Sequence, residues 1–376
     1  MSADVVPMRE DTPARDIPIA ELLEIVLERD GSDLHLTAGT PPAVRIHGDL
    51  KRLDAYPMLT PEQLRKMVYA ILPQRSRERF EQNLELDTSY SLPGKARFRL
   101  NVFFQRDAVG AVFRYIPFRI RGLQELGMPP QVADLARLPR GFVAVTGPTG
   151  SGKSTTLASM LDVVNTEREC HIMTIEDPIE YLHRHKRALV NQREVGADTI
   201  SFAEALKHVL RQDPDVILVG EMRDLETIQT AITAAETGHL VFATLHTQDA
   251  PQTIDRIIDV FPPHQQQQVR VQLSTTLQGV VTQQLLQTYD GKGRVCAAEV
   301  LVATPAVRNL IREGKVHQIY SAMQAGGRYG MRTMDQALAT LVGAGKISFE
   351  LAMQRCHDPN ELGRLVGKPV GGSSDA

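Results

Sequence analysis

The sequence lacks tryptophan and has few aromatic side chains and few cysteines. Its 376 residues include no Trp and 3 Cys, and aromatic residues make up 5%. Cys170, Cys296 and Cys356 are far apart along the chain and form no C-x-x-C pair. This spacing argues against a disulfide framework or a cysteine-bound zinc site. We therefore expect three buried or partly buried thiols in a reducing cytoplasm.

A large excess of one charge and a long apolar run are also absent. The formal net charge is −3, with 42% hydrophobic and 23% charged residues, which is typical of a soluble globular protein. Without an overall basic field, bulk binding of nucleic acid is not indicated. No run of apolar residues is long enough to span a bilayer, so we expect no transmembrane segment. Residues 1–7 lack the basic and apolar regions of a signal peptide.

The first third of the chain predicts a small α+β domain over residues 17–117, preceded by a flexible arm over 1–16. Pro18 begins an amphipathic helix, and Gly31 suits the C-cap of that helix. Thr60 and Gln63 form a capping box that opens a second helix through about Leu72. The strand-like segments are 33–37, 43–47 and an alternating stretch from 88 to 117 that is typical of an antiparallel meander.

The rest of the chain predicts an α/β domain over residues 141–366. Residues 118–140 form an expected linker, with a hinge near Glu125–Pro130, and 367–376 an expected disordered tail. Helices from Ser201 and from Leu225 alternate with near-continuous apolar strands, which indicate a parallel sheet covered on both faces. From about Pro251 onward we expect mostly helices. The predicted strands are 142–146, 171–175, 216–219 and 240–245.

One segment of this second domain is a complete phosphate-binding loop with the pattern G-x-x-x-x-G-K-[ST]. An apolar strand leads into it and a helix leads out, which is the context that the motif requires. Its glycines let backbone N–H groups approach phosphate oxygens, Lys153 reaches the β- and γ-phosphates, and Ser154 holds Mg²⁺. We therefore expect ATP and Mg²⁺ as ligands. The residues expected to bind them are Gly147, Pro148, Thr149, Gly150, Ser151, Gly152, Lys153, Ser154 and Thr155.

Acids and a histidine follow three of the predicted strands, at the edge of the sheet where ligands bind in parallel α/β folds. Glu221 follows an apolar strand and is the first choice for activating water or holding the metal, through a water molecule if not directly. Glu176 is the second carboxylate. His246 is placed to sense the γ-phosphate. His239 lies about 20 Å away at the other end of its strand, so it bonds a neighbouring loop or subunit, or is structural.

Arginines in the first domain are candidates for stabilising charge in a transition state. Such an arginine contributes about 10³–10⁵ in rate. Alternation places Arg97 and Arg99 on one face of their strand and Phe98 and Leu100 on the other. Composition alone leaves a solvated basic face as an equal alternative.

These motifs together resemble the type IV pilus retraction ATPases, the PilT family of secretion-type motors, over roughly residues 18–350. Near the C-terminus the resemblance has one small departure, Val307 where isoleucine is usual. The segments that carry it are Gly31–Leu36, the Walker A loop Gly147–Ser154, the Asp box Thr174–Tyr181, the Walker B segment Val219–Asp224, the His box Thr237–His246 and Ala306–Glu313.

The resemblance implies a PAS-like N-terminal domain, a RecA-like ATPase domain and a ring-shaped homohexamer at the inner face of the cytoplasmic membrane. It implies that Arg99, Arg114 and Arg106 reach the nucleotide. It also implies an inner-membrane pilus platform protein as a partner, with an accessory retraction ATPase as a further candidate. Assembly and secretion ATPases of this superfamily usually carry a four-cysteine zinc module. The absence of those cysteines favours retraction of the pilus over its extension.

Several alternatives stay open. The chain resembles accessory retraction paralogues and assembly or type II secretion ATPases as well, although the segment Arg308–Glu313 favours the main retraction motor. A RecA-like nucleic-acid translocase would need basic pore loops and stacking aromatics, and both are scarce here. A nucleotide-dependent scaffold that does not hydrolyse ATP would not need Glu176 and Glu221.

Overall fold

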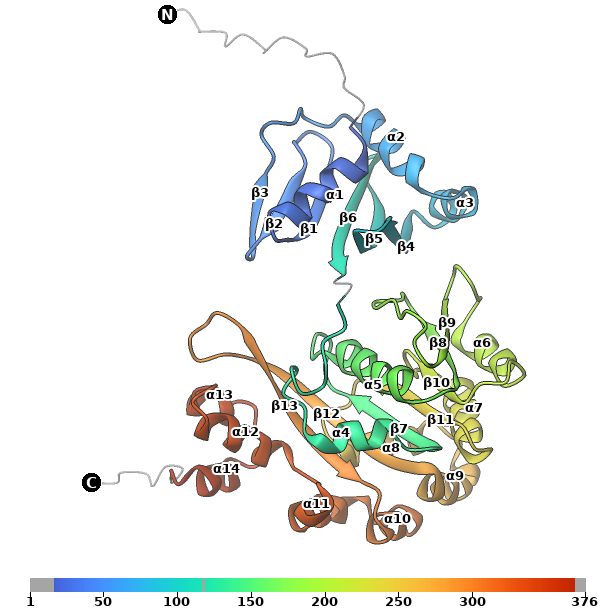
Figure 1. The fold of residues 1–376 in the computed structure, drawn as a ribbon, viewed down its shortest axis with the longest axis vertical. Helices are drawn as coiled ribbons and strands as arrows, with labels where there is room; N and C mark the ends of the chain where they lie inside the picture. The colour runs from blue at the N-terminus through green and yellow to red at the C-terminus, as the bar shows by residue number, and fades with distance from the viewer. Residues whose placement is uncertain (1–16, 117–118, 369–376) are drawn as a thin grey trace, which may run out of the picture. The chain divides into compact units, whose positions relative to one another are not determined.

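The computed structural model describes residues 17–116 and 119–368, and it divides into two compact units, Met1–Phe118 and Arg119–Ala376 (Figure 1). The predicted arm over 1–16 and all but the first two residues of the predicted tail lie outside the described residues. Within the described part of the chain, no helix combines the length and the apolar character needed to cross a membrane.

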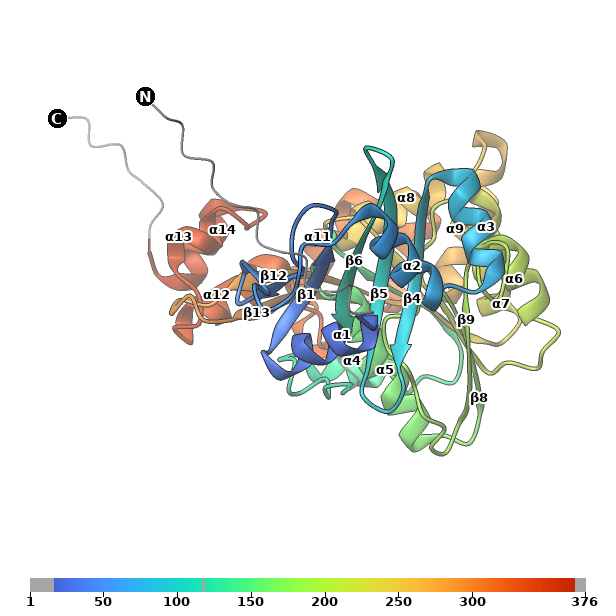
Figure 2. The same cartoon turned by 90° about the horizontal axis from the view of Figure 1, so that it is seen from above.

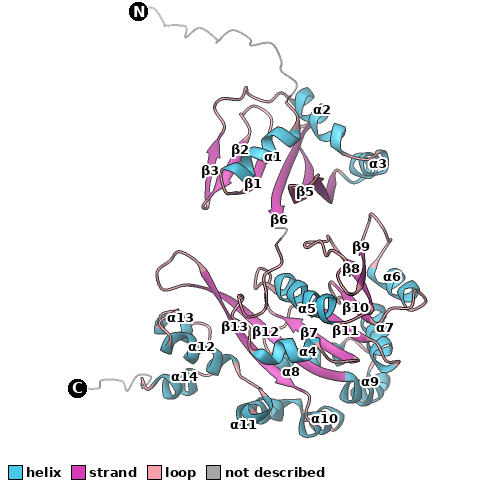
Figure 3. Ribbon diagram, in the orientation of Figure 1, coloured by secondary structure: helices cyan, strands magenta, loops and turns pink. Residues whose placement is uncertain are grey.

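The first unit is a six-stranded antiparallel sheet with helices packed on one face (Figure 3). Its strand order is β3-β2-β1-β6-β5-β4. The helices are α1 (Ile19–Glu28), α2 (Pro61–Ile71) and α3 (Gln74–Asn83). The strands are β1 (Gly31–Leu36), β2 (Ala43–Ile46), β3 (Asp49–Arg52), β4 (Glu85–Leu92), β5 (Ala96–Gln105) and β6 (Ala108–Ile116).

Local signals set the ends of these elements. The predicted capping box is present, because Thr60 Oγ1 accepts from Gln63 N at 3.2 Å and Thr60 N donates to Gln63 Oε1 at 2.9 Å. The predicted C-cap at Gly31 is wrong. Asp30 takes the left-handed conformation there, with φ 52°, and Gly31 is the first residue of β1. A side chain at Gly31 would meet Val44 at 2.6 Å.

The second unit is built around a seven-stranded sheet in the order β13-β12-β7-β11-β10-β8-β9. All neighbouring strands pair in parallel except β12 and β13. The strands are β7 (Gly141–Thr146), β8 (His171–Glu176), β9 (Leu189–Glu194), β10 (Val216–Val219), β11 (Leu240–Leu245), β12 (Leu277–Gln287) and β13 (Arg294–Val302).

Helices cover both faces of this sheet, as predicted. Helices α4 and α5 bury one face, α6 to α9 bury the other, and α12 to α14 group beside β12 and β13 (Figure 2). The helices are α4 (Pro130–Ala136), α5 (Lys153–Glu167), α6 (Phe202–Val209), α7 (Leu225–Glu236), α8 (Ala250–Asp259), α9 (Pro263–Thr276), α10 (Pro305–Arg312), α11 (Ile319–Ala325), α12 (Met334–Gly343), α13 (Phe349–Met353) and α14 (Pro359–Val366).

The expectation of a mostly helical chain after Pro251 is wrong at β12 and β13. β12 begins at Leu277 directly after α9 ends at Thr276, so no turn residues mark the change. Its glutamines and leucines are also good helix formers. Tertiary pairing decides the outcome, because Leu277–Thr282 forms a parallel ladder with β7 in the middle of the sheet.

The predicted linker over 118–140 is also corrected. From Arg119 onward this segment belongs to the second unit. Leu123 and Met128 are buried against the core that α4 and α5 share, and Met128 N donates to Leu123 O at 2.9 Å. The segment Glu125–Pro130 is therefore packed onto one unit, which argues against the predicted hinge there.

The segment Ala306–Glu313 lies in and just after α10. Arg308 donates to the carbonyl oxygens of Ser274 and Thr275 at 2.9 and 2.8 Å, and to Gln278 Oε1 at 3.0 Å. The guanidinium therefore caps the C-terminus of α9. Arg308 thus fixes the abrupt change from α9 to β12.

Candidate active site

The phosphate-binding loop connects the fully buried strand β7 to α5. Gly147 has φ 136°, and a Cβ atom there would collide with Gln283 O and lie 2.7 Å from Ser151 Oγ. Gly152, at φ 92°, is the N-cap of α5. The loop therefore needs glycine at Gly147 both for its backbone conformation and for its close contact with β12.

Strand β12 braces this loop from behind. Gln283 Nε2 donates to Ser151 O at 2.9 Å in a buried contact, and the hydroxyls of Thr146 and Thr282 are 2.9 Å apart. Sequence analysis missed Gln283 because it missed the strand that carries it. The β-branched run Val280–Thr282 is the local signal that could have indicated the strand.

Lys153 is the first residue of α5, and its ammonium folds back over the loop. Nζ donates to Gly147 O at 2.8 Å and to Pro148 O at 3.1 Å. Burial lowers the pKa of Lys153, although the carboxylates of Glu221 and Glu180 act in the opposite direction. Lys153 and the N-terminus of α5 thus concentrate positive charge at one place.

Glu221 follows β10, and its carboxylate contacts two side chains, Arg223 and His246. Arg223 Nη2 donates to Glu221 Oε2 at 2.7 Å, and His246 Nε2 lies 2.9 Å from Glu221 Oε1. Burial alone would raise the pKa of Glu221, but Arg223 and His246 together hold it below its usual range. The carboxylate is therefore ionised. Arg223 is a site residue that sequence analysis did not single out, although it stands two positions after Glu221.

The structure separates the two histidines of the His box. His246 follows β11 and contacts Glu221. His239 precedes β11, where its Nδ1 lies 2.9 Å from Ala234 O and 3.2 Å from Thr237 Oγ1. The ring of His239 is thus bonded to the C-terminal end of α7, at the edge of the sheet opposite the phosphate-binding loop.

Glu176 is the last residue of β8, next to the strand that delivers Glu221. Gly220 N donates to Ile175 O at 2.8 Å, so the backbones that carry the two acids are in contact. Burial raises the pKa of Glu176 to about 7, and hydrogen bonds from Thr174 Oγ1 and Gln192 Nε2, at 2.6 and 3.0 Å, offset this only in part. A carboxyl group with such a pKa is suited to exchange protons near neutral pH.

Tyr181 extends the site on the side of α5. Its hydroxyl lies 2.9 Å from Thr155 Oγ1, and its carbonyl oxygen accepts from Gln192 Nε2 at 2.8 Å. Because Gln192 also donates to Glu176, one hydrogen-bonded chain links Thr155 to the second carboxylate.

The candidate arginines lie on the open face of the first unit's sheet or at its rim. Arg99 and Arg114 are directly opposite each other on β5 and β6, and both side chains are exposed. Arg114 Nε donates to Asp33 Oδ1 at 2.8 Å, whereas the Arg99 side chain makes no hydrogen bond or ion pair within the described residues. Arg106 lies in the turn between these strands, with φ 48°.

The residues at the sheet edge of the second unit fit a magnesium nucleotide. The Ser154 hydroxyl and the Glu221 carboxylate are oxygen donors of the kind that Mg²⁺ prefers. Ser151 Oγ is buried inside the loop and has no hydrogen-bond partner in the described part of the chain. This orphaned hydroxyl within the loop is consistent with a loop conformation that is completed when a phosphate binds.

Comparison with known proteins agrees with this geometry. The family described as "Type II/IV secretion system protein" matches residues 19–350. The chain belongs to this family. A family member from Pseudomonas aeruginosa, "Type IV pilus retractation ATPase PilT", is 53% identical over 344 residues, which cover 92% of this chain and 99% of that protein. "Type IV pilus ATPase PilU" from the same organism is 45% identical over 356 residues, 95% of this chain and 92% of that protein.

A solved structure of the family has the same fold. "Crystal Structure of the Pilus Retraction Motor PilT and Bound ADP" matches this secretion-family chain with a TM-score of 0.87 and 52% identity, covering 93% of this chain and 99% of that one. The predicted fold class, a parallel α/β sheet with helices on both faces preceded by a smaller α+β domain, is thereby confirmed.

Proposed function

We propose that this protein is a Mg²⁺-dependent ATPase that powers retraction of a type IV pilus, and with it twitching motility. The observation that carries hydrolysis is the contact of Glu221 with His246 on the edge of the sheet that also bears the phosphate-binding loop. The pilus as the object of the work is supported by similarity to a retraction ATPase over nearly its whole length.

The binding step uses the loop and its flanking residues. Backbone N–H groups of the loop residues 149–154 and the ammonium of Lys153 would hold the phosphates, and Ser154 and Glu221 would hold the metal. Magnesium, when bound, neutralises phosphate charge and favours phosphoryl transfer. To bind the phosphates, Lys153 exchanges its contacts with Gly147 O and Pro148 O for phosphate oxygens.

The hydrolytic step needs a group that orients and deprotonates water. Glu221 is ionised and tied to His246, so it is positioned to orient the attacking water. Glu176, with its pKa raised to about 7, accepts a proton near neutral pH. His246 stands at the strand end where the γ-phosphate is expected and reports its presence to Glu221.

The arginines of the first unit give a reason for hydrolysis to depend on assembly. Arg99 and Arg114 stand side by side on one sheet face, and Asp33 offsets only Arg114. We propose that this pair, with Arg106 nearby in sequence, stabilises phosphate charge in the transition state within a homohexameric ring. His239, which faces away from Glu221, is proposed to act at a contact between subunits.

The proposed place of action is the cytoplasmic face of the inner membrane, where a platform protein of the pilus would receive the motion. An accessory retraction motor is the second candidate, because this chain is also similar to a second pilus ATPase, the PilU protein. That similarity covers 95% of this chain and 92% of the PilU protein. Deletion of the gene separates a retraction role from an assembly role. Loss of the main motor should leave excess pili without retraction, whereas loss of an assembly ATPase should remove pili.

The site assignment is tested by ATP turnover of the purified protein with Lys153→Ala and Glu221→Ala. We expect each substitution to reduce turnover by about 10²-fold or more. Lys66→Ala on α2 is a matched surface control. Unchanged turnover in both site variants would overturn the assignment, and stimulation by single-stranded DNA would favour a nucleic-acid translocase instead.

A further inference from the structure

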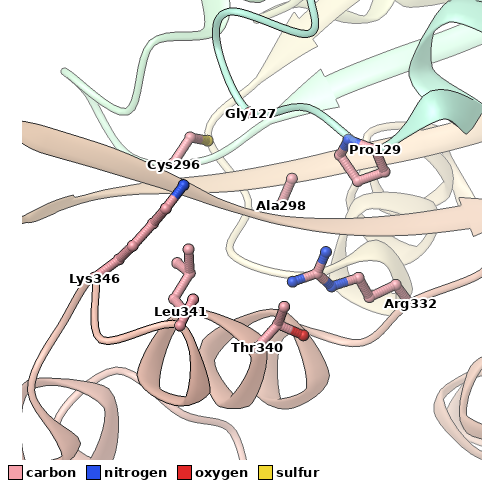
Figure 4. Close-up of a pocket in the computed structure, with 9 residues that line it drawn as sticks. Gly127, Pro129, Cys296, Ala298, Arg332, Thr340, Leu341 and Lys346 are labelled. Atoms are coloured by element: carbon pink, nitrogen blue, oxygen red, sulfur yellow. The ribbon is translucent and has the colours of Figure 1, made fainter.

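The second unit contains a cavity of about 170 Å³ whose lining combines two cations with no acid. It lies between β13, the loop before α4, and α12 with the residues that follow it. Figure 4 shows the guanidinium of Arg332 and the ammonium of Lys346 approaching the cavity from opposite sides, with the Cys296 sulfur nearby. This volume holds several water molecules or a small organic ion.

The guanidinium of Arg332 has few hydrogen-bond partners and no neighbouring acid within residues 17–116 and 119–368. One guanidinium nitrogen, Nη2, donates to Ala337 O at 3.0 Å, but Nε is buried and has no partner in the described part of the chain. No carboxylate of the described residues lies within ion-pair distance of Arg332 or Lys346. Two backbone hydrogen bonds hold Arg332 against Val300: Val300 N donates to Arg332 O at 2.8 Å, and Arg332 N donates to Val300 O at 2.9 Å. Arg332 therefore cannot easily move to solvent.

Arg332 is half-buried, and its buried Nε lacks a hydrogen bond, which is costly for a cationic group; an anion that accepts from it reduces that cost. A guanidinium presents a planar fork of donors that matches the oxygens of phosphate and carboxylate. We propose that this cavity is a binding site for a small multivalent oxyanion, either inorganic phosphate or an organic carboxylate, held between Arg332 and Lys346. The proposal does not depend on the nature of the motor's cargo.

The cavity wall is connected to the phosphate-binding loop. Cys296 Sγ lies 3.7 Å from Gln283 Nε2, and the same nitrogen donates to Ser151 O at 2.9 Å. An anion beside Cys296 would therefore be connected to the loop through two contacts, Cys296 to Gln283 and Gln283 to Ser151. Occupancy of the cavity and binding of nucleotide are expected to influence each other, and such coupling is reciprocal.

Calorimetric titration of the full-length chain tests the site. The Lys153→Ala background weakens anion binding by the phosphate-binding loop, so that the cavity is measured. We expect saturable binding of phosphate or citrate at one ion per subunit. Arg332→Gln and Lys346→Gln should each weaken it by about tenfold or more, through loss of a charge-assisted hydrogen bond. Comparing the two probes tells free phosphate from an organic acid.

Two exposed cationic residues provide matched controls: Arg294 on β13, the strand that lines the cavity, and Lys292 in the turn before it. Arg294→Gln and Lys292→Gln should leave anion affinity unchanged, since neither residue lines the cavity. No saturable binding, or equal binding by Arg332→Gln, would overturn the site. If Arg332→Gln does not fold, Lys346→Glu decides the matter, because its new carboxylate should pair with Arg332 and abolish binding.

The coupling has its own readout. Citrate should change the ADP affinity of the wild-type chain by about fivefold or more, and this change should vanish in Arg332→Gln. Equal ADP affinities with and without citrate would overturn the coupling. Failure of ADP to bind at all would instead contradict the proposed nucleotide site, so the two failures are distinct.

Discussion

His246 Nε2 lies 2.9 Å from Glu221 Oε1, and the two side chains come from the ends of neighbouring parallel strands. Strands β10 and β11 pair in register from Val216 and Leu240 to Val219 and Ala243. β11 continues two residues further, so the imidazole stands above the turn that carries Glu221. The pair is therefore a product of register, and it makes Glu221 sensitive to any group that His246 binds.

Replacement of His246 tests this sensitivity. We expect His246→Ala to lower kcat by about 10²-fold, because a positioned hydrogen-bond donor is lost near the reacting phosphate. Affinity for ADP should stay close to the wild-type value. The measurement is steady-state ATP turnover together with ADP titration. His264→Ala, at an exposed position near the start of α9, is the control, and equal loss of activity in both variants would contradict the role of His246.

Replacement of Gln283 tests the brace behind the phosphate-binding loop. Gln283→Ala removes the buried donor to Ser151 O, so we expect unfolding to become easier by about 1–3 kcal/mol. Nucleotide affinity should fall by about tenfold, because the loop loses its support. Gln284→Ala is the matched control on the next residue, whose amide makes only a long contact of 3.4 Å with Arg355 O. A similar loss of affinity in the control would argue against the brace.

Replacement by alanine should have different effects at Arg99 and Arg114, the cross-strand neighbours on β5 and β6. Arg114 supports Asp33, which is 3% exposed and whose pKa is held below its usual range by Ser32 and Arg114 despite burial. Arg114→Ala should therefore cost about 1 kcal/mol of stability, since the exposed guanidinium is screened by solvent. Arg99→Ala should leave unfolding unchanged and still reduce ATP turnover of the assembled protein. Full activity of Arg99→Ala at high protein concentration would remove Arg99 from the site.

Glu299 predicts how stability varies with pH. This residue on β13 is 1% exposed, and its oxygens accept from Ala250 N at 2.8 Å and Met334 N at 3.1 Å. Burial raises its pKa from 4.5 to about 7. The folded state thus holds a proton that the unfolded state releases. The resulting stability, at most about 3 kcal/mol, is fully present below pH 4.5 and is lost as the pH rises to about 7.

Denaturant unfolding at pH 5 and pH 8 measures this effect. We expect the wild type to be less stable at pH 8, and Glu299→Gln to show a smaller difference between the two conditions. The variant should also be less stable than the wild type at both pH values, because the amide N–H of the introduced glutamine would then face a backbone N–H. Glu313→Gln, which is exposed, should keep the wild-type difference. An unchanged difference in Glu299→Gln would show that another group, such as Glu176, sets the pH dependence.

Much of the site was predictable because its parts are local. The loop Gly147–Ser154 is recognised by its own residues, and the apolar strands before Glu176, Glu221 and His246 are recognised by theirs. Parallel pairing then brings their ends to one edge, as the general rule for such sheets requires. The contact between Glu221 and His246 follows from this rule.

Other features depended on pairing between distant segments. β12 looks like a continuation of α9 in sequence, and only its ladder with β7 makes it a strand. Gln283 therefore could not be connected with Ser151, which is 132 residues away. The partners of Arg332 could not be predicted either, since its cavity is made by β13, α12 and the loop before α4.

The amino-acid sequence by itself determined the family, the phosphate-binding loop, and the acids and histidine at the strand ends. These depend on short runs of residues whose chemistry and backbone preferences act locally. Only the tertiary structure decided that β12 supports the loop, that Arg223 and His246 share Glu221, and that the half-buried Arg332 lies beside no acid of the described chain. Those outcomes depend on which distant segments exclude water together, and no local pattern encodes that choice.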